Sequence, residues 1–236
     1  MRKVVVTNLI SLDGYVAGPG GDLSVMPIDH GFDRYNLERL QTADTILMGA
    51  RSFGGVIGFW PHVLEDPSFS PAVQMDPSTA PIHAEIATRN HEARKVVISD
   101  ALTPADAEPW ADSTTIVPRA EAHDTVRRLR AEDGADIVIF GSPTVWNDML
   151  QAGLVDEVHL LVGPAMVGGG VAAFREGTAA RLRLTDHRQL DGSDLVLLSY
   201  AVEGAESDRG STPTDCRPST AAWAAITVPL ARVVDP

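Results

Sequence analysis

The sequence predicts a mixed α/β fold in which helices flank a central sheet of about eight strands and a C-terminal antiparallel hairpin closes that sheet. Short apolar runs rich in Val and Ile recur along the chain, and their nearly continuous apolarity is typical of strands covered on both faces. Segments with helical periodicity lie between several of these runs. Two further runs flank Asp-Gly-Ser-Asp at 191–194, which is a hairpin signal.

The individual elements follow from these patterns. A helix at 33–43 places Leu37 and Leu40 on one side, and another at 143–152 begins with a proline and ends at Gly153. We expect strands at 3–11, 44–50, 94–100, 114–118, 136–141 and 157–167, a third main helix at 120–132, and the two hairpin strands around 191–194.

Residues 54–93 carry five prolines among several Ser and Asp residues. The pattern predicts a short helix at 81–89 and a long loop over most of the remainder. Residues 1–203 form one predicted domain. From Gly204 the composition changes, and 204–236 is predicted to be a largely disordered tail.

Composition narrows the classes of function. The net charge of −13 argues against binding to nucleic acid or to an anionic membrane. The single cysteine allows no intramolecular disulfide and no cysteine zinc cluster, and the histidines lack metal-ligand spacing. We expect a cytoplasmic protein without a signal peptide, a membrane span or a metal ion.

Arg51 is the only Lys or Arg between Arg39 and Arg89, and it follows a predicted strand directly. A strand that ends at Gly49 presents free backbone N–H groups, and Arg51 with Ser52 adds a bidentate cation and a hydroxyl. This arrangement predicts a phosphate site. The alternative interpretation is a surface arginine paired with a nearby carboxylate.

Two other strand ends carry polar residues. Ser99 follows one strand and either binds the same phosphate or caps its own turn. Gly141 and Ser142 lead directly into a helix, where the N–H groups of Ser142, Thr144 and Val145 offer a site for a pyrophosphate. The alternative is an ordinary helix with Ser142 as its N-cap. Neither a GxGxxG motif nor a P-loop occurs.

The first strand ends at Ser11 and Asp13, next to a glycine-rich loop at 14–21. A carboxylate in this place orients a polar substrate or relays a proton, unless Asp-Gly is simply a tight turn. Trp60 is interpreted as part of the core or as the wall of a cleft. The glycines at 167–170 favour an irregular turn over a phosphate cradle.

The order of these motifs resembles the dihydrofolate reductase-like superfamily, and most closely the C-terminal reductase domain of the riboflavin-biosynthesis deaminase-reductase. The matching segments are SLDGYVAGPGGDL, ADTILMGARSF, KVVISD and DIVIFGSPTVWNDMLQAGLVDEVHLLVGPAMVGGG, within about 2–203. The resemblance implies a three-layer dihydrofolate reductase-like fold, NADPH as cofactor, hydride transfer to a small heterocycle, and a homodimer.

The resemblance also implies roles for single residues. Gly49, Arg51 and Ser52 would contact the adenosine phosphate side, with Ser99 at the 2′-phosphate. Gly141 through Val145 would hold the pyrophosphate, and Ser11, Asp13 and Gly14 would face the nicotinamide and the substrate. The chain departs from the family at Ala50, where arginine is usual, and it lacks the zinc signature of the deaminase half.

The sequence therefore favours an NADPH-dependent reductase that acts on a small-molecule substrate. Asp13 is the first candidate for the catalytic residue, with Asp29, Asp33 and a bound water as competitors. Two alternatives stay open. One is the 5-amino-6-(5-phosphoribosylamino)uracil reductase of riboflavin biosynthesis, whose phosphorylated substrate calls for a second basic cluster that the sequence does not show beyond Arg34. The other is a non-catalytic NADPH-binding module.

Overall fold

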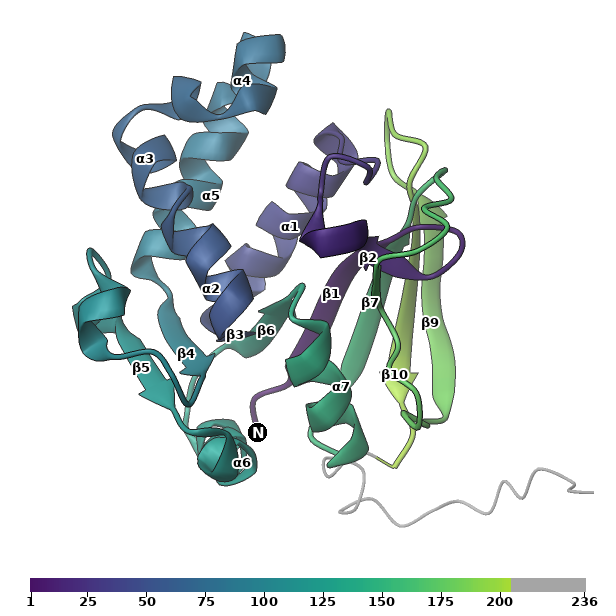
Figure 1. Ribbon diagram of the computed structural model, residues 1–236. Coiled ribbons are helices and arrows are strands. Elements are labelled where there is room, and N and C mark those ends of the chain that lie inside the picture. Colours follow the sequence, from purple (N-terminus) through teal and green to yellow (C-terminus); the bar gives the residue numbers. More distant parts are fainter. Residues whose placement is uncertain (205–236) are drawn as a thin grey trace, which may run out of the picture.

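The computed structural model describes residues 1–204, so the tail predicted at 204–236 lies outside the described residues apart from Gly204. Helices cover both faces of a central eight-stranded sheet (Figure 1). The predicted mixed α/β fold class is confirmed. Within this described part, no helix is long and apolar enough to cross a membrane.

The sheet has the strand order β5-β4-β3-β6-β1-β7-β10-β9. All neighbours from β5 to β7 pair in parallel, whereas β10 runs antiparallel to β7 and β9 runs antiparallel to β10. The six parallel strands therefore end at one common edge, here called the carboxyl edge. The strands are β1 (Val4–Ile10), β3 (Ala43–Gly49), β4 (Arg94–Ile98), β5 (Thr114–Val117), β6 (Asp136–Phe140), β7 (Glu157–Val162), β9 (Leu182–Gln189) and β10 (Val196–Val202).

The strand predictions are confirmed with small shifts in their bounds. The largest shift is at 157–167, because the strand ends at Val162 and the following residues form a loop. The C-terminal hairpin closes the sheet as predicted. A separate two-stranded pair, β2 (Tyr15–Ala17) with β8 (Val171–Ala172), joins the loops that follow β1 and β7.

Two apolar cores lie on opposite faces of the sheet, because successive strand residues point to opposite sides. On β3, Leu47 belongs to the core beneath α6 and α7, and its neighbours Ile46 and Met48 belong to the core beneath α1, α2 and α5. The helices are α1 (His30–Thr42), α2 (Ala50–Ile57), α3 (Trp60–Glu65), α4 (Pro71–Met75), α5 (Ala80–Glu92), α6 (Ala122–Ala131) and α7 (Pro143–Gln151).

The loop predicted over most of 54–93 is wrong, because this segment is largely helical. Every one of its five prolines lies at the first or second position of a helix, where its fixed φ is favourable and its missing N–H costs nothing. Asp66 and Asp76 cap two of these helices by accepting hydrogen bonds from the Ser68 and Ser78 N–H groups. The first four prolines, predicted to lie in a loop, mark the starts of α3, η2 (Pro67–Phe69), α4 and η3 (Pro77–Thr79). Pro81 lies at the start of α5, which confirms the helix predicted at 81–89.

A chain of polar side chains runs beneath α1. The Tyr35 hydroxyl lies 2.7 Å from His159 Nδ1, and His159 Nε2 lies 3.1 Å from Glu157 Oε2. Lys3 Nζ donates to the other oxygen of Glu157 at 2.7 Å. The hydrogen bonds from His159 and Lys3 outweigh the effect of burial and lower the pKa of Glu157 to about 2.

We expect Glu157→Gln to flatten the acid limb of the stability profile. The folded-state pKa of Glu157 lies below its ordinary value of 4.5, so its ionised form stabilises the fold above that value. This contribution is lost as the pH falls from 4.5 towards 2. Urea unfolding across this range measures it, with Glu85→Gln, which removes an exposed carboxylate on α5, as the control. Parallel profiles for wild type and Glu157→Gln would contradict the assignment.

Candidate functional site

Two helix N-termini meet at the carboxyl edge of the sheet. Helix α2 begins directly after β3, and α7 begins just after the neighbouring strand β6. Neither helix has a side-chain hydrogen bond that caps its N-terminus. Backbone N–H groups and the positive ends of two helix dipoles therefore point to one place. Such a place binds anions, and phosphate groups in particular.

Short contacts hold the two helix starts together. Ser142 Oγ accepts a hydrogen bond from the Gly49 N–H at 3.1 Å. A Cβ added to Gly141 would lie 3.7 Å from Ser52 Oγ, and one added to Gly49 would lie 3.2 Å from a methyl group of Val145. The structure therefore brings together five of the residues predicted to bind a cofactor: Gly49, Ser52, Gly141, Ser142 and Val145.

The start of α7 differs from the predicted one in two ways. Ser142 has φ 50° and ψ 52°, and it is the one non-glycine residue in the left-handed region within 1–204. Ser142 occupies the N-cap position, as the alternative predicted, but its hydroxyl faces Gly49 and makes no cap hydrogen bond within residues 1–204. The Val145 N–H donates to the Ser142 carbonyl at 2.9 Å and is not free, whereas the side chain of Thr144 is exposed.

Arg51 lies in the first turn of α2, and its side chain is exposed. The ion pairs formed within residues 1–204 do not include it, so the alternative of a surface ion pair is not what the structure shows. The glycine-rich loop after β1 approaches its guanidinium, because a Cβ on Gly21 would lie 3.6 Å from Arg51 Nη1. Among the described residues, Arg51 is thus an unpaired cation between the helix start and a glycine loop.

Ser99 closes the turn after β4. Its hydroxyl oxygen accepts hydrogen bonds from the N–H groups of Ala101 and Leu102, as the turn-cap alternative predicted. Beside it is a cavity of about 390 Å³ at the carboxyl ends of β4 and β5. Its walls combine apolar and polar side chains, which suits a flat ring with polar substituents. The lining residues are Ser99, Asp100, Leu102, Pro104, Thr114, Ile116 and Pro118.

Asp13 joins two loops at the end of β1. Its carboxylate accepts hydrogen bonds from Ser11 Oγ at 2.5 Å, from the Gly168 N–H at 2.7 Å and from the Val167 N–H at 3.1 Å. The Ser11 bond, followed by the two backbone bonds, lowers the pKa of Asp13 to about 2. At neutral pH this group is an ionised acceptor, so the geometry favours an orienting role over proton donation.

The loop after β7 is also held from α7. Buried Asn147 donates from Nδ2 to the Ala173 carbonyl at 2.8 Å and accepts from the Arg175 N–H at 3.0 Å. The backbone of Gly170 packs so closely on Ala17 that a Cβ would clash with it. The glycine run at 167–170 is therefore the irregular turn that the sequence favoured. Sequence reasoning missed Asn147, whose signal is an amide on the apolar face of its helix.

A second polar cluster lies further along the same edge. Helix α1 starts after the loop that leaves β1, and α5 leads into the first residue of β4, so both helices begin at the carboxyl edge. Asp33 in α1 and His83 in α5 are both buried, and Asp33 Oδ2 lies 3.2 Å from His83 Nε2. The Trp60 ring lies 6.1 Å from that of His83.

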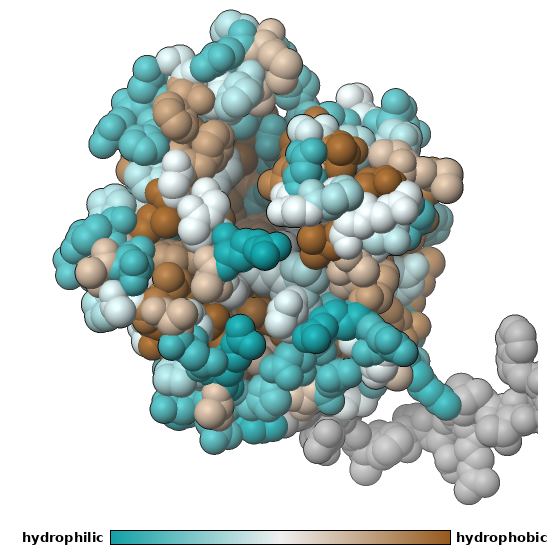
Figure 2. Space-filling model, viewed as in Figure 1, coloured by the Kyte–Doolittle hydropathy of each residue, from teal (hydrophilic) through white to brown (hydrophobic). Residues whose placement is uncertain are grey.

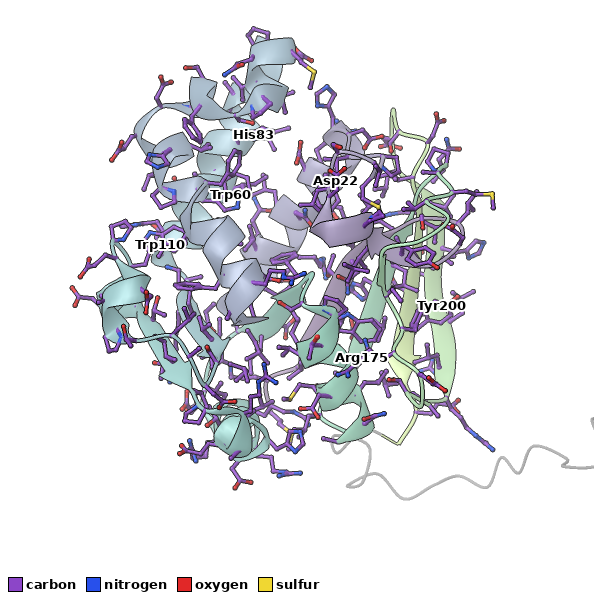
Figure 3. The ribbon with its side chains drawn as sticks, viewed as in Figure 1. Asp22, Trp60, His83, Trp110, Arg175 and Tyr200 are labelled. Atoms are coloured by element: carbon purple, nitrogen blue, oxygen red, sulfur yellow. The ribbon has the colours of Figure 1, made fainter. Side chains whose placement is uncertain are left out.

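This cluster borders a hollow in the surface. Figure 2 shows the hollow between the side of the molecule that carries α3 and α5 and the segment that carries η1 (Pro19–Gly21). Trp60 and His83 lie on one side of it and Asp22 on the other (Figure 3). Trp60 packs against the core beneath α1, α2 and α5, as the core interpretation predicted, and its role as a cleft wall stays a prediction. Sequence reasoning missed the role of His83, which it considered only as a metal ligand.

The third acidic candidate, Asp29, has a structural role. Its Oδ1 accepts hydrogen bonds from the Gly31 and Phe32 N–H groups and so caps α1. Its Oδ2 accepts from Ser193 Oγ at 2.6 Å, which ties the helix to the hairpin turn. Asp29 thus caps a helix and Asp13 holds two loops together, whereas Asp33 pairs with His83.

The parallel strands with two helix N-termini at their carboxyl edge define an α/β domain with a candidate anion-binding edge. Residues 2–197 match the model of the RibD C-terminal domain, and the chain belongs to this family. Two relatives come from Bacillus subtilis (strain 168). The uncharacterized protein YyaP is 26% identical over 175 residues, covering 73% of this chain and 80% of YyaP. The uncharacterized protein YwjB is 23% identical over 194 residues, covering 80% of this chain and 92% of YwjB.

Solved structures agree on the fold. A putative riboflavin biosynthesis protein from Shewanella sp. PV-4 has a TM-score of 0.58 at 20% identity, covering 86% of this chain and 99% of that one. A second structure, from Thermotoga maritima, has a TM-score of 0.55 at 16% identity and is a diaminohydroxyphosphoribosylaminopyrimidine deaminase/5-amino-6-(5-phosphoribosylamino)uracil reductase. The match covers 85% of this chain and 56% of that one.

Replacing Gly170 by alanine should destabilise the protein by about 2 kcal/mol, because the new Cβ would clash with the Ala17 backbone at a φ of 138°. Gly169→Ala is the matched control, since no atom lies within 4 Å of its added Cβ and its φ is not in the left-handed region. Urea denaturation of both variants measures the difference. Equal stability of the two variants would contradict the close packing of the two loops.

Proposed function

We propose that the protein is an NADPH-dependent reductase that transfers a hydride to a small heterocyclic substrate. One observation carries this proposal: in the part of the chain that the structure describes, two helix N-termini without side-chain caps and the unpaired guanidinium of Arg51 share one edge of the sheet. A dinucleotide carries a pyrophosphate, and NADPH adds a 2′-phosphate, so this edge suits three phosphate groups. Membership of the RibD C-terminal domain family supports the same reaction class.

Each part of the cofactor has a partner of matching chemistry. The start of α7, with exposed Thr144 and glycine at 141, would receive the pyrophosphate, because backbone N–H groups there point outward. Arg51 and Ser52 in the first turn of α2 would bind the 2′-phosphate, Arg51 through two guanidinium N–H groups and Ser52 through its hydroxyl. The cavity beside Ser99 would take the adenine ring between Leu102 and Ile116.

When bound, the cofactor supplies the hydride. The residues of the chain would bind the cofactor and the substrate, orient them and enclose the site. Asp13 clips the loop after β7 to the loop after β1, and Asn147 holds the same loop from α7. These two anchors keep the ends of β1 and β7 covered, which favours a fixed geometry between the two reactants. Ser11 and Gly14 flank Asp13 at the end of β1 and would face the nicotinamide.

The substrate class is the open part of the proposal. The Thermotoga relative is named as a 5-amino-6-(5-phosphoribosylamino)uracil reductase, which makes a pyrimidine the first choice. A phosphorylated substrate needs a cationic side chain to bind its phosphate. Arg34 is the basic residue that the sequence offers for this role, but its guanidinium donates a hydrogen bond to the Asp191 carbonyl. An unphosphorylated pyrimidine therefore suits this chain better. NADPH oxidation with a panel of pyrimidines and pterins separates an enzyme from a non-catalytic binding module.

Replacing Arg51 by alanine should weaken NADPH binding by about 1.5–3 kcal/mol and leave NADH binding nearly unchanged, because one charge-assisted hydrogen-bonding partner of the 2′-phosphate is lost. Fluorescence titration with both cofactors measures this. Arg94→Ala, which removes an exposed arginine at the opposite edge of the sheet, is the matched control. Equal weakening of both cofactors would remove the 2′-phosphate role from Arg51.

We also propose that the protein forms a homodimer through the β9 end of the sheet. Strand β9 is eight residues long, every residue in it is exposed, and it is the last strand of the sheet, so one edge of its backbone is unpaired within residues 1–204. Exposed Leu182, Leu184 and Val196 lie on it and on β10. A long, free, partly apolar edge favours self-association unless a partner covers it.

In a dimer of this kind, Leu184→Lys should convert the protein to a monomer, because the substitution places a charge within the apolar contact. Sedimentation velocity measures the mass of both forms. Leu64→Lys, at a comparably exposed leucine on α3, should leave the dimer intact. A monomeric wild type, or a dimer that survives Leu184→Lys and fails with Leu64→Lys, would contradict the proposal.

A further inference from the structure

Within residues 1–204, Lys95 carries a buried charge that no carboxylate balances. It is the second residue of β4 and is 0% exposed, and the ion pairs of this part of the chain do not include it. Burial lowers the pKa of its ammonium group from 10.5 to about 8, so the group is charged at neutral pH although the fold disfavours the charge. Lysine is almost never fully buried without a charged partner, and exceptions of this kind point to a function.

Three uncharged groups hold the ammonium instead. Lys95 Nζ donates to the His91 carbonyl at 2.7 Å and to Ser113 Oγ at 3.0 Å. It also lies 4.3 Å from the centroid of the Trp110 ring, a cation–π contact. The His91 carbonyl belongs to the last turn of α5, where the helix dipole is negative. These contacts join β4 and α5 to the residues just before β5.

The side chains packed around Lys95 do not balance its charge. Its neighbours in register on β3 and β5 are uncharged: Ile46 and Thr114. The titratable side chain of the cluster is His91, whose Nδ1 accepts a hydrogen bond from Trp110 Nε1 at 3.1 Å and therefore carries no proton. The charged residues that adjoin these contacts in the sequence are exposed: Glu92, Arg94 and Asp112.

The segment of residues 99–113, which connects β4 to β5, rests on this cluster. It contains two short 3-10 helices, η4 (Pro104–Ala107) and η5 (Ala111–Ser113), and most of its residues are exposed. Its buried apolar side chains are Ala107 and Trp110. Much of its hydrogen bonding is internal, as in the turn at Ser99 and the capping box of η4. Few buried apolar contacts are typical of a unit that opens locally.

The same segment is one wall of the cavity beside Ser99. Leu102 and Pro104 line the cavity from the 99–113 segment, and Thr114 and Ile116 line it from β5. Because Thr114 pairs in register with the lysine of β4, the cavity and the buried ammonium adjoin at the start of β5. A movement of the segment away from β5 would widen the cavity and bring the ammonium into contact with water.

We propose that the 99–113 segment opens locally over this cavity, and that the buried ammonium of Lys95 sets the free energy of that opening. The charge is desolvated in the closed form and solvated in the open form, so it favours opening. A neutral amine or an apolar side chain at 95 favours the closed form. Opening admits a planar ring between Leu102 and Ile116. That this ring is an adenine rests on the proposed function, whereas the opening itself does not.

The same difference links the opening to pH. At alkaline pH the closed form, with its lowered pKa, binds fewer protons than an open form in which Lys95 has the ordinary pKa of 10.5. The closed form therefore gains stability as the pH rises from about 8 towards 10.5. This gain is the reverse of what an ion-paired lysine gives, because the pKa of an ion-paired lysine is raised by folding.

Hydrogen exchange of the full chain measures the opening. Peptides from 99–113 are followed by mass spectrometry after millisecond labelling, and their protection factors are corrected for the intrinsic exchange rate at each pH. Peptides from α6 are the internal reference. Lys95→Met removes the charge and keeps the length of the side chain, and Arg94→Met, at the exposed cation paired with Glu132, is the matched control. The ¹⁹F resonance of 5-fluorotryptophan at Trp110, assigned with Trp110→Phe, reports the charge of Lys95.

In wild type, the protection of 99–113 should rise about tenfold between pH 7 and pH 9, because the closed form loses its proton first. The Trp110 resonance should titrate with a midpoint near pH 8. Lys95→Met should protect the segment at least tenfold more than wild type at pH 7 and should lose both pH dependences. A change that arises from His91 survives in this variant, which retains His91. Arg94→Met should behave as wild type.

Equal protection of Lys95→Met and wild type at pH 7, or a segment that exchanges only together with α6, would overturn the proposal. If Lys95→Met does not fold, as judged by thermal unfolding, wild type decides, and protection that stays constant between pH 7 and pH 9 overturns it. Saturating NADPH should raise the protection of 99–113. No effect of NADPH, with the dependence on Lys95 retained, would remove the adenine of the proposed reductase from this cavity and leave the local opening standing.

Discussion

The parallel pairing of β3 with β6 is the constraint on which the site depends. Residue 46 pairs with residue 138, so the two strands end almost level, and the helices that follow them start side by side. The bond from the Gly49 N–H to Ser142 Oγ fixes this arrangement across the two strand ends. Any side chain at 49 larger than hydrogen would press on Val145. The anion-binding edge thus results from backbone register before any charged side chain contributes.

The opposite end of the site depends on two loops that hold one another. The loop after β7 contains no long secondary-structure element, yet it is fixed at three places: by the Asp13 carboxylate, by the pairing of β2 with β8, and by the Asn147 amide. Each anchor uses a buried or half-buried polar group to satisfy backbone N–H and carbonyl groups. Rigidity here comes from hydrogen bonding, whereas at the strand ends it comes from the register of the sheet.

The features that could be predicted from the sequence are those that depend on local residue patterns and on where strands end. The strands, the hairpin and the cluster around Gly49, Gly141 and Ser142 followed from apolar runs and from the rule that parallel strands end together. The short helices between residues 60 and 79 were missed because proline is common both in loops and at helix starts, and the sequence pattern alone does not separate the two. The pairing of Asp33 with His83 joins residues fifty positions apart, which no local spacing records.

The electrostatics of the site reconcile an acidic protein with an anionic ligand. A net charge of −13 would repel a phosphate at long range in pure water. At physiological ionic strength the screening length is about 8 Å, so most of these carboxylates do not act at the edge of the sheet. What remains there is local: one unpaired arginine and two helix N-termini. Because the residue before Arg51 is Ala50, the proposed discrimination of the 2′-phosphate would rest on Arg51 alone among the basic side chains of that turn.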